Sequence, residues 1–165
     1  SGERIYHSSR EKWVSPRIDD ARHIEDLFVV LRQFCCDMGR MLVLTPMAIG
    51  FHMDHAITAH VAMRLENDAI DLLFYEDFPY VIDPSAGKGI EDSPEDALQR
   101  LERAPERRLF IPVDPDHKVQ VLERYETQIS GLFGRFDDVH SALRENQYEG
   151  QPVEYFWTSR PSRKP

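Results

Sequence analysis

Cysteine is scarce in this 165-residue sequence, and a long apolar run is missing from it altogether. The two cysteines, Cys35 and Cys36, are adjacent on a segment expected to be helical, a geometry that does not favour a structural disulfide between them. A reducing, cytoplasmic compartment is the simpler interpretation. No apolar stretch approaches the ~20 residues that a bilayer requires, so no membrane span is expected.

Basic charge is also in short supply. The chain carries 29 acidic and 20 basic residues and a formal net charge of −9, which argues against nucleic acid as a partner because nucleic-acid binders carry a basic footprint. The sequence contains no glycine-rich phosphate loop and no serine nucleophile elbow, so nucleotide hydrolysis is not expected. With 41% apolar and 30% charged residues, residues 1–165 have the length and composition of one globular domain.

The first half of the sequence alternates expected helices and strands. A helix is predicted from Asp19 to Gly39, with one apolar face that should pack on a sheet. A buried strand, Met41–Leu44, follows it, then a helix over about His55–Glu66 and a second strand, Ile70–Tyr75. This order is typical of α/β proteins.

The second half gives weaker signals. A stretch rich in proline, glycine and acids, Asp83–Glu95, is predicted as a surface loop, and a short exposed helix and an edge strand, Leu109–Val113, should come after it. Asp114 then begins a helix whose apolar positions continue to Phe133. The chain ends in an expected strand, Val153–Trp157.

The densest group of chemically active side chains is the segment Gly50-Phe51-His52-Met53-Asp54-His55, directly after the first strand. In open α/β sheets ligands bind at the carboxyl ends of strands, and His52 and His55 would share one face of a helix. Imidazole is a common zinc ligand, but a structural zinc site would need about two further ligands. The alternative is a helix start with Asp54 as a first-turn carboxylate and two solvated histidines.

Several sequence segments together resemble the LmbE/PIG-L family of zinc-dependent deacetylases, which act on N-acetylglucosamine-containing substrates. Thr45-Pro46 followed by Gly50–His55 is similar to the family's second metal motif, and Tyr75-Glu76-Asp77-Phe78-Pro79-Tyr80 is similar to the strand-end phrase after it. The segments between Lys118 and Gly134 and the closing Glu154–Trp157 resemble the family's last helix and strand. The resemblance implies a Rossmann-like three-layer α/β sandwich with a mainly parallel sheet, of which this chain is the C-terminal portion.

The resemblance also implies roles for individual residues. His55 would be a zinc ligand, and His52 would stabilise the oxyanion and protonate the leaving amine. Asp54 would orient one of these imidazoles. Tyr75, Glu76 and Asp77 at the strand end would line a sugar pocket, with Lys118 as a further candidate. The alternative places Tyr75 in the core, the two acids on a solvated loop and Lys118 as an exposed charge.

One departure from the family is large. Its first motif, an Ala-His-Pro-Asp-Asp-Glu phrase that carries the general base and two zinc ligands, does not occur here. We therefore expect a deacetylase that is inactive until a missing N-terminal half, covalent or on a separate chain, restores the site for a small N-acetyl sugar conjugate. The alternative is a non-catalytic binding or assembly module of the same fold. Without the missing half, an open sheet edge could also favour a homo-oligomer.

Overall fold

The computed structural model describes residues 20–36, 38–67, 69–86, 91–125, 127, 129, 132–133 and 139–162. Within them a mixed sheet runs in the order β1-β2-β5-β3, and a short strand, β4, pairs with β5 outside this path. The strands are β1 Met41–Pro46, β2 Ile70–Tyr75, β3 Arg103–Pro112, β4 Gln147–Tyr148 and β5 Gln151–Pro161. The expected early strands are present, and the two late ones are longer than predicted.

The sheet is parallel only at one side. β1 and β2 pair in parallel from Met41 opposite Ile70 to Pro46 opposite Tyr75, whereas β5 is antiparallel to both β2 and β3. The α/β class is therefore correct, but the prediction of a mainly parallel sheet is wrong. Among the described elements only the first two strands are joined by the helical crossover that parallel pairing needs, and β5 returns beside β2 in the opposite direction.

Helix α2, Met53–Leu65, and helix α3, Pro94–Arg100, cover one face of the sheet. Buried side chains of both helices, among them Leu65 and Leu98, belong to one apolar cluster with the sheet residues Leu72, Phe74 and Trp157. Met41 and Val43 of β1 also pack against this cluster. Since alternate strand residues point to opposite faces, Leu42 and Leu44 point the other way, and both are exposed. The described residues thus form two layers over β1 rather than the expected three.

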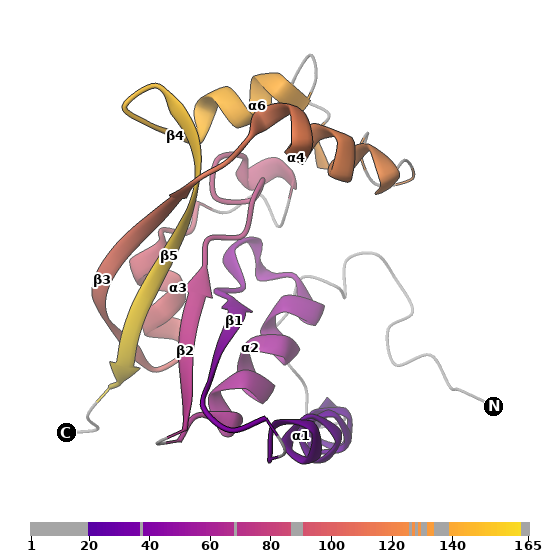
Figure 1. Ribbon diagram of the computed structural model, residues 1–165, viewed down its shortest axis with the longest axis vertical. Helices are drawn as coiled ribbons and strands as arrows, with labels where there is room; N and C mark the ends of the chain where they lie inside the picture. The colour runs from indigo at the N-terminus through magenta and orange to yellow at the C-terminus, as the bar shows by residue number, and fades with distance from the viewer. Residues whose placement is uncertain are drawn as a thin grey trace.

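Helix α1, Asp20–Cys36, lies against α2 instead of the sheet (Figure 1). Phe28 packs against the apolar cluster, but Leu27, Leu31 and Phe34 are exposed although they were predicted to face a sheet. No helix in the described part of the chain is both long and apolar enough to cross a membrane.

A smaller group of helices lies beyond the carboxyl end of β2, at the top of Figure 1. It contains α4 Pro115–Leu122, the 3-10 turn Glu123–Tyr125 and α6 Val139–Glu145. A second apolar cluster joins these helices to Phe78 and Ile82, which follow β2. The single long helix expected from Asp114 is interrupted after Leu122, and part of its predicted length lies outside the described residues.

Candidate functional site

The histidine motif lies after the carboxyl end of β1 on a tightly wound turn. Ala48, Gly50 and Phe51 all have positive φ, and the 3-10 turn η2, Ile49–Phe51, leads straight into α2. A Cβ on Gly50 would approach the Cβ and Cγ of Tyr80 to 2.9 Å, so glycine is needed there for space as well as for its φ of +80°. The turn and Tyr80 together set where α2 begins.

His52 is the N-cap residue of α2. Its Nδ1 accepts a hydrogen bond from the Asp54 backbone N–H at 3.3 Å, so the proton of the neutral ring lies on Nε2. The Asp54 carboxylate is 84% exposed, and its Oδ2 lies 3.9 Å from the same His52 nitrogen. The N–H of the neutral His52 ring therefore lies on the side of the ring away from the helix start.

His55 follows one turn later and is held by Asp77, the second residue after β2. Its Nδ1 is 2.5 Å from Asp77 Oδ1, and its ring centroid lies 5.1 Å from that of His52. The Asp77 side chain is 0% exposed, and its Oδ2 accepts a hydrogen bond from the Ile49 backbone N–H at 3.0 Å. Burial raises the pKa of Asp77, while the contacts with His55 and Ile49 act in the opposite direction.

The sequence prediction gave Asp77 a place in the lining of a sugar pocket and gave Asp54 the task of orienting an imidazole. In the structure the side chain that contacts His55 is Asp77, whereas Asp54 lies beside His52 at the helix start. Sequence spacing favoured Asp54 because it lies between the two histidines, and the strand pairing that brings Asp77 to His55 is not visible in the sequence.

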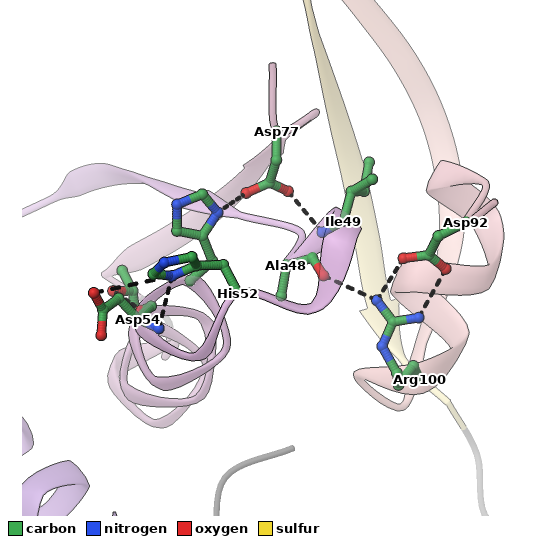
Figure 2. A network of polar contacts seen from close by, with 9 residues as sticks. Ala48, Ile49, His52, Asp54, Asp77, Asp92 and Arg100 are labelled. Carbon is green, nitrogen blue, oxygen red and sulfur yellow. Dashed lines mark hydrogen bonds and ion pairs between the residues drawn. The ribbon is translucent and has the colours of Figure 1, made fainter. Parts of the chain in front are cut away.

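The Ala48–Phe51 turn is also held from the side of α3 (Figure 2). Arg100 forms two 2.8 Å hydrogen bonds with the Asp92 carboxylate and donates a third, at 3.1 Å, to the Ala48 carbonyl. Its guanidinium also lies over the Phe51 ring, 4.2 Å from the centroid. Neither Arg100 nor Asp92 was singled out from the sequence, where both fall in an unremarkable charged segment.

The donor set for a metal is incomplete in this part of the molecule. Among the described residues, no group of three or more histidine, cysteine, aspartate or glutamate side chains is arranged to hold a metal ion. A ring that donates from Nδ1 to a carboxylate has its Nε2 lone pair free, which is the usual arrangement of a zinc-bound histidine. His55 therefore fits one position of a zinc site, and the other positions need further ligands.

A cavity of about 310 Å³ lies beside the end of β2. Tyr75 and Lys118, both predicted to bind substrate, line it together with Phe78, Glu154 and Phe156. Lys118 is 13% exposed, with its Nζ 2.7 Å from Glu154 Oε1 and 4.6 Å from the centroid of the Phe78 ring. Burial raises the pKa of Tyr75, so its hydroxyl remains a hydrogen-bond donor at neutral pH.

Comparison with known proteins gave relatives of one kind. No family model matches the chain. A 2′-N-acetylparomamine deacetylase from Niallia circulans is 31% identical over 99 residues, which cover 60% of this chain and 32% of that protein. The resemblance to the deacetylase family is confirmed.

Solved structures agree with this at the level of the fold. The A40926 pseudoaglycone deacetylase superposes with a TM-score of 0.65 at 20% identity, over 88% of this chain and 60% of that one. The zinc-inhibited form of a teicoplanin deacetylase gives a TM-score of 0.64 at 24% identity, over 92% of this chain and 57% of the other. The chain thus spans about a third of the curated relative and under two thirds of these structures.

Proposed function

We propose that this chain is the C-terminal part of a zinc-dependent amide hydrolase that removes the acetyl group from an N-acetylglucosamine-type sugar conjugate. The observation that carries the proposal is the pair of histidines at the carboxyl end of the parallel strands, with the His55 Nδ1 held by the buried Asp77. The deacetylase names of the sequence relative and the solved structures support the same reaction class.

The two histidines have different parts in this proposal. His55, with its Nδ1 bound to Asp77, offers Nε2 as one protein ligand to zinc. His52 offers an N–H from Nε2, because its Nδ1 accepts the hydrogen bond of the helix start. That N–H can donate to the amide carbonyl oxygen as negative charge develops there. Delivery of a proton to the departing amine requires the imidazolium form of His52, in which Nδ1 is also protonated and faces the Asp54 carboxylate instead of accepting from the Asp54 N–H. The exposed Asp54 carboxylate stabilises the protonated form of His52.

The residues that complete the site come from a polypeptide N-terminal to this chain. A bound zinc would activate a water molecule toward the amide carbonyl. The remaining ligands and the base for that water would lie in the part of the relatives that this chain does not span, whether joined to it or on another chain. The incomplete donor set among the described residues supports this division.

The cavity beside β2 is the candidate substrate pocket. Aromatic rings from Phe78 and Phe156 supply flat apolar surfaces suited to a sugar ring, and Tyr75 and Lys118 supply donors for its hydroxyl groups. Asp77 does not line this cavity in the structure. Its part in the proposed site is indirect, through its contacts with His55 and Ile49. Free cysteines at Cys35 and Cys36 are in keeping with a reducing, cytoplasmic compartment.

The test uses the native protein or complex that carries this chain together with its N-terminal half. Loaded with zinc, it should release acetate from an N-acetylglucosamine conjugate, and His55→Ala should abolish this release. His52→Ala should reduce kcat by about 100-fold or more while zinc remains bound. A zinc-loaded assembly that releases no acetate from any N-acetylated amino sugar would leave a non-catalytic module of the same fold as the better description.

A further inference from the structure

Asp77 makes a cross-link between two segments that lie far apart in the sequence. It follows β2, and its two carboxylate oxygens contact different groups of the histidine segment: Oδ1 faces His55 Nδ1 at 2.5 Å, and Oδ2 accepts from Ile49 N–H at 3.0 Å. Figure 2 shows Asp77 reaching toward Ile49 with one oxygen. The side chain is 0% exposed, so water does not compete for either contact.

The geometry points to Asp77 as a positioning residue that fixes His55 in the Nδ1–H tautomer and thereby reserves Nε2 as the metal-binding atom. This inference rests on the proposed function for its purpose, but the tautomer itself is a property of the chain alone. A buried carboxylate accepts hydrogen bonds and donates none, so the hydrogen between the two groups belongs to the imidazole. The Ile49 contact then fixes the carboxylate, which in turn fixes the ring.

An amide of the same shape could not replace this carboxylate. Asparagine has one acceptor oxygen and one donor nitrogen, whereas the carboxylate faces donors on both oxygens, His55 Nδ1–H on one and Ile49 N–H on the other, and the Met47 backbone N–H also contacts it. If the amide oxygen faces Ile49, its NH₂ group faces His55 and forces the proton to Nε2. If the amide is flipped, two donors meet at Ile49 and the 3-10 turn loses its buried acceptor.

The experiment is a two-bond ¹H–¹⁵N correlation spectrum of the histidine rings in the isolated chain. It is recorded at about pH 8, above the ordinary pKa of histidine. The wild-type His55, assigned by comparison with His55→Gln, should show a protonated Nδ1 and an unprotonated Nε2. In Asp77→Asn the proton should move wholly or largely to Nε2.

Asp92→Asn is the matched control. It weakens the hold of Arg100 on the same turn through the Ala48 carbonyl, but its carboxylate does not contact His55. Asp92→Asn should leave the His55 tautomer unchanged even if it lowers the melting temperature to the same extent. A general loosening of the turn would instead alter both variants alike, and that result would overturn the assignment.

The wild-type spectrum decides the matter even if Asp77→Asn does not fold. A proton on Nε2 of wild-type His55 would mean that Asp77 carries the shared proton, and the inference would be wrong. In the zinc-loaded native assembly, Asp77→Asn should weaken zinc binding by about 10- to 100-fold. If the tautomer result holds but the assembly releases no acetate, the proposed function fails and the assignment of Asp77 stands.

Discussion

Glu76 and Arg108 form a bidentate ion pair that joins the end of β2 to β3 across the intervening strand β5. Arg108 Nε lies 2.8 Å from Glu76 Oε1, and its Nη2 lies 3.0 Å from Oε2. The Trp157 indole N–H of β5 donates to the same carboxylate at 2.7 Å. The Glu76 side chain is 1% exposed, so these donors replace the water that the carboxylate has lost.

Arg108→Ala should destabilise the fold substantially. It leaves the buried Glu76 carboxylate with the Trp157 N–H as its remaining side-chain donor, and we expect a loss of about 2 kcal/mol in the free energy of unfolding. The measurement is urea denaturation followed by circular dichroism. Arg107→Ala, an exposed neighbour on the same strand, should change stability by less than about 0.5 kcal/mol. Equal effects of the two variants would show that the buried ion pair is not what matters.

Gly50→Ala should be more destabilising than Gly150→Ala. The two glycines have nearly the same φ, +80° and +81°, so both substitutions incur the left-handed strain of about 1 kcal/mol. A Cβ at Gly50 would also meet Tyr80 at 2.9 Å, whereas one at Gly150 would meet nothing within 4 Å. The free energy of unfolding should fall by about 1–3 kcal/mol more in Gly50→Ala than in Gly150→Ala, as measured by thermal or chemical denaturation. Equal losses of stability in the two variants would show that the Tyr80 side chain moves aside without an energetic cost.

The local elements of the first half could be predicted from the sequence. The strand Ile70–Tyr75 has the predicted bounds, and the helix expected from about His55 begins only two residues earlier, at Met53. Both predictions depend on short-range apolar patterns. Strand direction depends instead on which distant segments pair, and nothing in the pattern of Gln151–Pro161 indicates that it runs antiparallel beside β2.

The candidate site was likewise predictable only in its local part. The histidines lie three residues apart in the sequence and are therefore conspicuous, but Asp77 reaches His55 only because β1 and β2 pair in a register that brings Pro46 opposite Tyr75. The signal that could have pointed to it is a carboxylate two residues after the buried apolar end of a strand, where it is expected to need a partner. Arg100 gave no comparable signal, because its hydrogen bond to the turn is to a backbone carbonyl, that of Ala48.

Mild acid should destabilise the chain partly through His60. Burial lowers the pKa of His60 below 6.5, and the charge of Glu102 opposes this shift only in part. The unfolded chain therefore binds a proton more readily than the folded one, and stability falls as pH drops from about 7 through 6.5 toward the folded pKa. His60→Gln should reduce this slope in urea midpoints between pH 7.5 and about 5.5. An unchanged slope in His60→Gln would contradict the prediction.

The isolated chain should hold zinc weakly or not at all. His55 and His52 fall short of the three protein ligands that a catalytic zinc requires, and no further group in the described residues completes the set. Elemental measurement after dialysis should give far less than one zinc per chain, and adding the N-terminal half should restore one. Tight, stoichiometric zinc in the 165-residue chain would mean that the ligand assignment is incomplete.

The open side of β1 should make the isolated chain associate. Within the described part of the chain, β1 is an edge strand whose outer backbone groups pair with no other strand, and its Leu44 is 53% exposed on the face that α2 and α3 do not cover. We expect concentration-dependent self-association by light scattering, relieved when the N-terminal half is supplied. Leu44→Thr should reduce it, while Ile111→Thr, at a position 54% exposed on the opposite edge strand β3, should not. Because threonine is β-branched and strands favour β-branched residues, both variants should melt cooperatively. A wild-type chain that stays monomeric at high concentration would show that this face needs no cover, and would favour a complete, diverged domain over a fragment.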